Sequence, residues 1–308
     1  MLDELVRRHA EGSLAKSEYI EAMFESHSAL FKYADLLSTT DLSKIEIRDG
    51  QVLVTVRSSG IQLECDRYDT RQAPFEILNF KAYEPALARA MLAAIKPGDT
   101  VWDIGANMGY YALTFAKLAP LANVWAFEPL PVTFGRLQRN ALLNGLSNLK
   151  LENVGFLDEN KEVDFYFEPA LSVRASAANL AGDSSVQTVR GRVHRLDDFA
   201  QARGLKADVI KCDCEGAELF VFKGALEVLG TQKPIVFSEM LRKWSLKFGY
   251  HPNDLITLFS RLGYKCYRFE GEKLIFTPEV FDRTEATNFA FLHDERHAAY
   301  IKAWTSKP

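Results

Sequence analysis

The residues best suited to chemistry lie in one stretch, Val101–Tyr111, which reads VWDIGANMGYY. A short apolar run ends at Asp103, and Gly105, Asn107 and Gly109 follow at two-residue intervals. Glycines at such a point allow bare backbone amides, and the N-terminus of the helix behind them, to approach a ligand closely. The pattern therefore predicts a strand, a tight loop and a helix that together bind a nucleotide-like cofactor.

The spacing of this loop distinguishes between two kinds of cofactor. Dinucleotide-binding loops use G-x-G-x-x-G, so that a pyrophosphate can lie against the helix N-terminus. This chain has D-x-G-x-N-x-G, and Asp103 would repel a pyrophosphate but accept hydrogen bonds from an amino group. Glu128 ends the next predicted strand, where an acid can accept hydrogen bonds from both ribose hydroxyls. Together they favour S-adenosylmethionine, a nucleoside that carries an amino acid, over a nicotinamide cofactor.

A second charged run, Asp208–Glu218, reads DVIKCDCEGAE. A central parallel strand is normally apolar on both faces, but here Lys211, Asp213 and Glu215 recur with a period of two. They share one face near the carboxyl end of the strand, where ligands bind in open α/β sheets. Glu239 ends the next predicted strand and adds a carboxylate at the same edge. We interpret this edge as part of a functional site; a structural Lys–acid pair is the alternative.

The composition is that of an ordinary globular protein. Of the 308 residues, 47% are hydrophobic and 25% are charged, and the net charge of −4 argues against nucleic acid as a partner. The sequence contains no signal peptide and no apolar run of about eighteen residues that would span a membrane, so a cytoplasmic protein is expected. Four cysteines are too few for a disulfide framework, and we expect Cys212 and Cys214 to be small buried hydrophobes.

The elements that must hold these residues alternate between strands and helices from Thr100 onward. Such alternation predicts a doubly wound α/β fold with a mostly parallel sheet and helices on both faces. Near the end of the chain, strands follow one another with little helix between them. We expect strands at Thr100–Ile104, Val124–Glu128, Leu149–Val154, Val209–Asp213, Pro234–Glu239, Tyr264–Phe269, Lys273–Phe276 and Asn288–His293, and helices at Pro85–Ile95, Tyr110–Leu118, Pro131–Asn144, Ala217–Leu229 and Pro252–Leu262.

The first part of the chain carries no chemical motif. Residues 1–40 have apolar positions at helical spacing, and three short alternating runs follow, with Asp49-Gly50 as a hairpin signal between the first two. Residues 1–75 are therefore predicted to form a helical and β-hairpin extension, and residues 76–308 the main domain.

Four segments resemble successive signatures of the FkbM family of S-adenosylmethionine-dependent methyltransferases: DIGANMGYYALTFAK, FEPLPVTFGRLQRNALLNG, LDDF and IKCDCEGAELFVFKGA. Tyr83-Glu84-Pro85 and Asn288-Phe289 also match that family's pattern, whereas Cys212 and Cys214 stand where the family usually has aliphatic residues. The resemblance implies a class I methyltransferase domain, a Rossmann-like and mostly parallel seven-stranded sheet with an antiparallel last strand.

The resemblance also implies which residues bind the cofactor. The glycine loop would line its methionine and ribose side, Glu128 would hold the ribose, two residues would flank the adenine, and Glu84 would close over the methionine end. The full predicted set is Glu84, Asp103, Gly105, Ala106, Asn107, Gly109, Tyr110, Glu128, Pro129 and Phe156.

Transfer of the methyl group to an alcohol requires a general base, because the hydroxyl must lose its proton near the transition state. Asp213 is the first candidate, with Glu239 and Glu215 next, and Lys211 could keep a neighbouring carboxylate ionised. The resemblance favours a hydroxyl on a sugar, glycan or natural product as the acceptor.

The loop at residues 240–251 follows the strand that ends at Glu239. Trp244 could stack on a sugar, and Arg242 and His251 are further candidates for substrate contact, with ordinary loop packing as the alternative.

Two other functions stay open. Asp213 and Glu239 could hold Mg²⁺, as in catechol-type O-methyltransferases, since hard oxygen ligands suit that ion. The protein could also be a non-catalytic methyltransferase fold that only binds partners, although clustered charge argues against this. The sequence does not indicate an oligomeric state.

Overall fold

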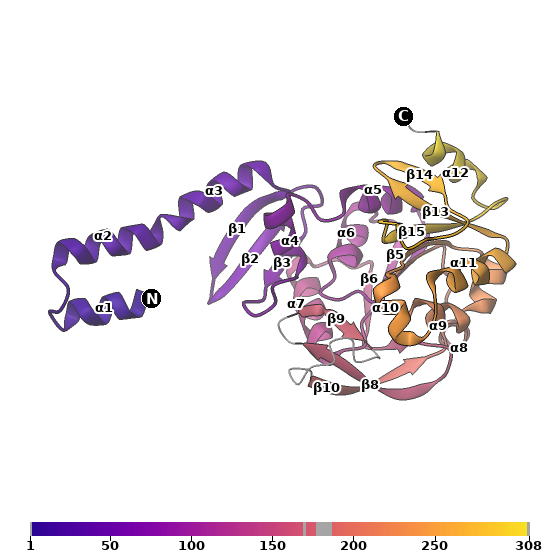
Figure 1. Ribbon diagram of the computed structural model, residues 1–308, viewed down its shortest axis with the longest axis horizontal. Helices are drawn as coiled ribbons and strands as arrows, with labels where there is room; N and C mark the ends of the chain where they lie inside the picture. Colours follow the sequence, from indigo (N-terminus) through magenta and orange to yellow (C-terminus); the bar gives the residue numbers. More distant parts are fainter. Residues whose placement is uncertain (1, 169–170, 177–186, 307–308) are drawn as a thin grey trace.

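The computed structural model describes residues 2–168, 171–176 and 187–306, and an eight-stranded sheet forms its centre (Figure 1). From one edge to the other its strands are β6 (Leu149–Glu152), β5 (Asn123–Phe127), β4 (Thr100–Ile104), β11 (Val209–Cys212), β12 (Ile235–Glu239), β15 (Asn288–His293), β13 (Tyr264–Glu270) and β14 (Lys273–Phe276). The first five are parallel to one another. In contrast, β15 is antiparallel to both β12 and β13, and β14 is antiparallel to β13.

This sheet confirms the predicted class I methyltransferase fold. The antiparallel last strand of that fold is β15, inserted between β12 and β13. The edge strand β14, which its own sequence predicted, adds an eighth strand to the seven implied by the family resemblance. It pairs with β13 across a two-residue turn, where Gly271 takes a φ of 59° that favours glycine.

Helices cover both faces of the sheet, and alternate side chains of each strand point to opposite layers. Val101 packs into one core together with Phe115, whereas Trp102 packs into a second core with Phe222. Because both faces are covered, the inner strands are apolar along most of their length. The first layer contains α5 (Pro85–Ala94), α6 (Tyr110–Leu118), α7 (Pro131–Asn144) and α12 (Ala298–Thr305), and the second contains α8 (Leu196–Arg203), α9 (Glu218–Lys223) and α11 (Pro252–Arg261).

The predicted helix over Ala217–Leu229 is wrong in part, because the chain forms α9 and then a separate π-helical turn, Val228–Gln232. The helix ends at Gly224, where a Cβ atom would lie only 2.2 Å from the Leu157 carbonyl oxygen. This close contact fixes the end of α9 against the segment that follows β6.

A second, four-stranded sheet lies between β6 and α8 in the chain and was not predicted. Its order is β7 (Gly155–Phe156), β10 (Gln187–His194), β8 (Lys161–Glu168) and β9 (Leu171–Ser176). Phe165 and Val193 attach it to the main body through a small apolar cluster that includes Leu130. Four α-helices were also missed: α4 (Ala73–Phe80), α8, α10 (Arg242–Ser245) and α12.

The first part of the chain contains three helices, α1 (Leu2–Ala10), α2 (Lys16–His27) and α3 (Ala29–Thr39), followed by an antiparallel sheet of β1 (Leu42–Arg48), β2 (Gln51–Val56) and β3 (Gln62–Cys65). These elements agree with the prediction. The small sheet shares a core with α6, whereas the three helices extend away from the body (Figure 1). The domain boundary after residue 75 stays a prediction. None of the helices in the described ranges is both long enough and apolar enough to span a membrane.

Candidate active site

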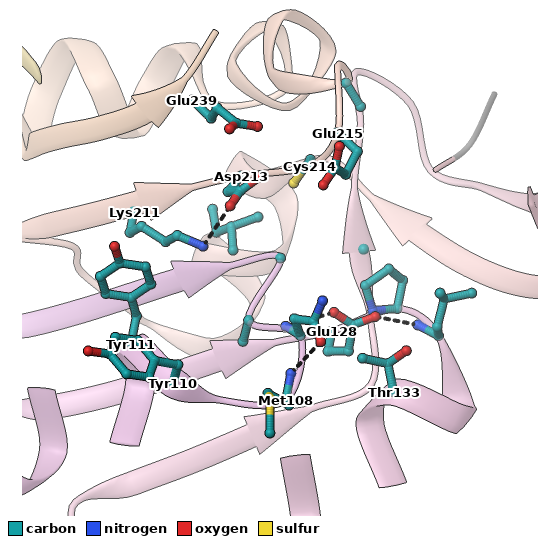
Figure 2. Close-up of a pocket in the computed structure, with 18 of the residues that line it drawn as sticks. Met108, Tyr110, Tyr111, Glu128, Thr133, Lys211, Asp213, Cys214, Glu215 and Glu239 are labelled. Carbon is teal, nitrogen blue, oxygen red and sulfur yellow. Dashed lines mark hydrogen bonds and ion pairs between the residues drawn. The ribbon is translucent and has the colours of Figure 1, made fainter. Parts of the chain in front are cut away.

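A cavity of about 600 Å³ opens where the parallel strands β4, β5, β11 and β12 end. Its position is the edge at which open α/β sheets bind ligands, and its volume is that of a small-molecule site. Most of the predicted site residues line it (Figure 2). They are Glu84, Gly105, Ala106, Asn107, Tyr110, Glu128, Pro129, Phe156, Lys211, Asp213, Glu215, Glu239 and Trp244.

Two predicted cofactor residues lie beneath this cavity and do not line it. Asp103 is fully buried, and its Oδ2 accepts a hydrogen bond from the Ala112 amide at 3.0 Å. Gly109 begins α6 with a φ of 97°, and a Cβ there would lie 2.5 Å from Leu137 Cδ1. Both residues therefore fix the loop and the helix behind it, and neither reaches the ligand space directly.

Two predicted substrate residues also lie outside the lining. Arg242 forms an ion pair with Asp282, which draws its guanidinium away from the cavity. His251 is the N-cap of α11, where its Nδ1 accepts a hydrogen bond from the Asn253 amide at 3.2 Å. Of the three candidates in this loop, the structure brings only Trp244 to the cavity.

The glycine loop has its tightest point at Gly105. A Cβ at this residue would lie 1.8 Å from the Asp213 carbonyl oxygen, and φ is 78°. The amides of Gly105 and Ala106 both donate to the carbonyl of Phe127, at 3.0 and 2.9 Å. The loop is therefore held between the ends of β5 and β11, and glycine is the residue that allows β4 and β11 to end side by side.

Glu128 is a buried acid on one side of the cavity (Figure 2). Its Oε2 accepts a hydrogen bond from the Asn107 amide and its Oε1 from the Leu130 amide, both at 3.0 Å. Burial raises the pKa of Glu128 to about 7, although the two backbone hydrogen bonds oppose this shift. The side chain is fixed in orientation and still has lone pairs for two ligand hydroxyls.

Lys211 lies between two carboxylates. Its Nζ is 3.4 Å from Asp103 Oδ1 and 3.3 Å from Asp213 Oδ2, and it lies 5.2 Å from the centre of the Tyr111 ring. Burial alone would lower the pKa of Lys211, but the charges of Asp213 and Asp103 outweigh it and raise the pKa well above its usual value. The structural Lys–acid pair considered from the sequence is present, and the same lysine also lines the cavity.

Three carboxylates, those of Asp213, Glu215 and Glu239, converge on the other side of the cavity (Figure 2). One oxygen from each lies within 4.8 Å of the others. Burial, followed by the charges of Asp213 and Glu215, raises the pKa of Glu239 well above the usual glutamate value. The arrangement can accept a proton, attract a cation or orient hydroxyl groups.

Glu218 was not recognised in the sequence as part of this site. It is buried, its Oε1 accepts from the amides of Cys214 at 2.7 Å and Gly216 at 3.2 Å, and the Tyr250 hydroxyl donates to its Oε2 at 3.3 Å. Burial raises the pKa of Glu218 to about 7. It fixes the turn that carries Asp213 and Glu215, and its place in the first turn of α9 was the available signal.

Glu84 has two partners that sequence reasoning also missed. The Tyr111 hydroxyl donates to its Oε2 and the Asn288 Nδ2 donates to its Oε1, each at 2.6 Å. The Glu84 backbone is left-handed, with φ 40° and ψ 53°, a strained conformation that is found preferentially at functional sites. Three distant segments therefore fix one carboxylate at the cavity wall.

The cysteine prediction holds for one residue and fails for the other. Cys212 is fully buried in the apolar core, and burial raises the pKa of its thiol well above the usual value. Cys214 lines the cavity, 3.8 Å from Cys212 between the sulfur atoms. It follows the end of β11, so it no longer shares the buried environment of the strand.

Comparison with known proteins identifies a family and relatives that match part of this chain. A family model described as the methyltransferase FkbM domain matches residues 103–266. The hexuronic acid methyltransferase AglP of Haloferax volcanii is 27% identical over 178 residues, which cover 58% of this chain and 68% of that protein. The 2-O-methyltransferase NoeI of Sinorhizobium fredii is 31% identical over 163 residues, covering 47% and 64%. The chain thus spans about two thirds of the length of these curated relatives.

A solved structure named methyltransferase FkbM, from Methylobacillus flagellatus, has a TM-score of 0.41 and 19% identity, covering 74% of this chain and 55% of that one. The family assignment depends on the family model, which matches more than half of the 308 residues. That match includes the glycine loop, Glu128 and the three convergent carboxylates. The chain belongs to the FkbM family of S-adenosylmethionine-dependent methyltransferases.

Proposed function

We propose that this protein is an O-methyltransferase that acts on a hydroxyl of a sugar, glycan or natural product. The observation that carries the proposal is one cavity that contains both the glycine loop with Glu128 and the three convergent carboxylates. The proposed binding site of the methyl donor would therefore lie next to the proposed acid–base site. The names of the relatives support the acceptor class, because one is a hexuronic acid methyltransferase and another is a 2-O-methyltransferase.

The residues that line the cavity fit S-adenosylmethionine. Glu128 would accept hydrogen bonds from the ribose hydroxyls, because its position is fixed by two backbone amides. Gly105 and Ala106 would line the ligand with backbone, and Pro129 and Phe156 offer apolar surfaces for the adenine. Glu84 would face the methionine end.

Glu239 is the general base that the electrostatics support best. Burial and like charges raise its pKa well above the usual value, so its carboxylate is a stronger proton acceptor than an ordinary glutamate. Among the described residues, no lysine or arginine forms an ion pair with Glu239, whereas Asp213 Oδ2 is paired with Lys211. Asp213 would then orient the acceptor hydroxyl. When bound, S-adenosylmethionine supplies an electrophilic methyl group. The carboxylates of Asp213 and Glu239 would hold the acceptor hydroxyl and take its proton.

The test measures transfer of an isotope-labelled methyl group to a panel of methyl glycosides of hexoses and hexuronic acids, followed by mass spectrometry. We expect an alkali-stable ether product with one acceptor class. Glu239→Gln and Asp213→Asn should reduce turnover by about 10²–10⁴-fold while calorimetry still detects cofactor binding. Near-normal turnover in both variants would overturn the roles of these residues. Cofactor binding without transfer to any acceptor would favour the non-catalytic alternative.

A metal-assisted version of the same reaction is the second candidate. The sequence supplied two ligands, and the observation that favours it is a third carboxylate, that of Glu215, close to Asp213 and Glu239. These oxygens suit Mg²⁺, which would bind the acceptor oxygens and lower the pKa of the hydroxyl. Activity should then disappear in EDTA and return with Mg²⁺. Full activity in EDTA would remove this candidate and leave the metal-free base.

A further inference from the structure

The helices α1–α3, which we call the arm, carry an apolar surface that nothing in the described protein covers. None of the residues in these three helices is buried. The arm extends away from the body in Figure 1. Its large exposed side chains, between 37% and 66% accessible, are Leu2, Val6, Ile20, Phe24, Leu30, Phe31, Tyr33 and Leu36.

The arm is nevertheless an ordered unit with a fixed base. The Arg57 guanidinium donates to the carbonyls of Leu37 at 2.7 Å and Leu42 at 2.8 Å, which ties the end of α3 to the first sheet. At the other end α1 folds back on α2, where the His9 and Tyr19 rings stack with centroids 4.4 Å apart. The exposed apolar side chains therefore project from a defined surface.

The extent of this surface matches that of a protein interface. Four of the eight residues, Ile20, Phe24, Leu30 and Phe31, lie on one face of the arm, and with these exposures and typical side-chain areas they present roughly 500 Å² of apolar surface. Tyr33 and Leu36 follow Phe31 by two and five residues and therefore lie on another face. Two such four-residue faces packed together would bury about 1,000 Å² in total, which is the size that a specific interface needs.

The spacing along the arm predicts a helical partner. Ser28 joins α2 to α3 with helical dihedral angles, φ −59° and ψ −20°, so the helical path continues through it. Residues at intervals of three and four form a stripe along this path, which is the pattern that packs against another helix. The stripe consists of Ile20, Met23, His27, Leu30 and Ala34, with Phe24 and Phe31 beside them, and it ends before Leu37, which packs against the main core.

The charge of the arm argues against a lipid surface. Residues 2–39 contain seven acidic and four basic side chains, a net charge of −3. Amphipathic helices that bind membranes are usually rich in Lys and Arg, which attract anionic lipids. Within α1, moreover, Arg7 is already paired with Glu4 and Glu11. An apolar stripe with few free cations is better suited to protein than to membrane.

We propose that the arms of two copies of this chain pack against each other, so that the protein is a homodimer. Two-fold symmetry presents the same stripe on both partners, and each copy then covers the surface that the other exposes. Phe24 and Phe31 would be the main anchors of the interface, since large aromatic side chains contribute most to affinity. The proposal is independent of the identity of the methyl acceptor.

The experiment is sedimentation equilibrium of the full chain at micromolar concentration. We expect twice the monomer mass of 34.7 kDa. The double variant Phe24→Glu and Phe31→Glu should raise the dissociation constant at least about 100-fold. The matched control is Leu121→Glu and Leu142→Glu, which adds the same charge at two leucines of the main domain that are 70% and 82% exposed. That control should remain dimeric.

Three outcomes would overturn the proposal. The wild-type chain could sediment as a monomer throughout, the arm variant could remain dimeric, or the control variant could dissociate equally. If the wild type is monomeric, co-sedimentation with phosphatidylcholine vesicles would instead assign the stripe to a lipid surface. Because the substituted side chains are exposed, circular dichroism should show unchanged helix content in both double variants.

Discussion

Glu128 is a residue whose function depends on its protonation. Burial raises its pKa to about 7, so a proton is bound below that pH and released above it. Only the ionised carboxylate can accept hydrogen bonds from both ribose hydroxyls, so cofactor binding favours loss of the proton. We therefore expect affinity for S-adenosylmethionine to weaken as the pH falls below 7, by up to about tenfold per pH unit.

Calorimetry on both sides of pH 7 measures this dependence, and binding near pH 7 should release protons to the buffer. Glu128→Gln is the control, since it cannot titrate and should bind weakly with little change over the same range. An affinity of the wild-type chain that is constant with pH would contradict the proposed role of the carboxylate.

Glu239 leads to a different pH prediction, because it acts on the acceptor. Burial and the charges of Asp213 and Glu215 raise its pKa, so the protonated form persists above the usual glutamate range and cannot take the hydroxyl proton. We expect kcat/KM to rise with pH as this proton is lost. Glu215→Gln removes one of the like charges and should shift this rise to lower pH. If kcat/KM of Glu215→Gln rises over the same pH range as that of the wild type, the rise does not report the loss of the Glu239 proton.

At the scale of single residues, the sequence predicted which side chains gather at one edge of the sheet better than how deeply each of them is buried. The period of two correctly placed Lys211 and Asp213 at one edge, because side chains alternate along a strand. It could not tell that Asp103 lies beneath the cavity, since that depends on how closely α6 packs. Nor could it find Tyr111 and Asn288 as partners of Glu84, because these residues lie 27 and 204 positions away along the chain and meet Glu84 only in the folded protein.

At the scale of elements, the site depends on the close approach of β4 and β11. Gly105→Ala would place a Cβ 1.8 Å from the Asp213 carbonyl oxygen, at a φ of 78°. The ends of the two strands must then separate, which would disturb both the glycine loop and Asp213. We expect a loss of at least about 3 kcal/mol in the free energy of unfolding and a loss of cofactor binding.

A substitution at a second glycine, Gly145, distinguishes the effect of steric overlap from the effect of backbone strain, because both variants place alanine at a positive φ. Gly145 ends α7 with a φ of 59° and has no atom within 4 Å of an added Cβ. Gly145→Ala should therefore cost only about 1 kcal/mol, from strain alone. Urea unfolding of both variants measures the difference, and equal losses would show that the contact with Asp213 contributes nothing.

The elements that the sequence predicted share a strong apolar pattern. The strands of the main sheet are covered on both faces, so their apolar runs were plain, and several of their bounds agree to the residue. The second sheet has a much smaller apolar cluster, with Phe165 and Val193 as its own members, and charged residues occupy much of the rest of β8 and β10. Val163 and Phe165 in β8, and Val189 and Val193 in β10, nevertheless alternate with polar residues and pack in one cluster, so a strand signal was present and sequence reasoning missed it.

At the scale of the whole molecule, the arm and the cavity are separate parts. The side chains of Phe24 and Phe31 are each 66% exposed, and neither residue lines the cavity. The charged double variant at these positions should therefore bind S-adenosylmethionine within about twofold of the wild type, and its free energy of unfolding per monomer should change by no more than about 0.5 kcal/mol. The dimer dissociation constant alone should respond. Calorimetry on the monomeric variant measures the affinity, and a large loss of cofactor binding would mean that the arm of one copy supports the active site of the other.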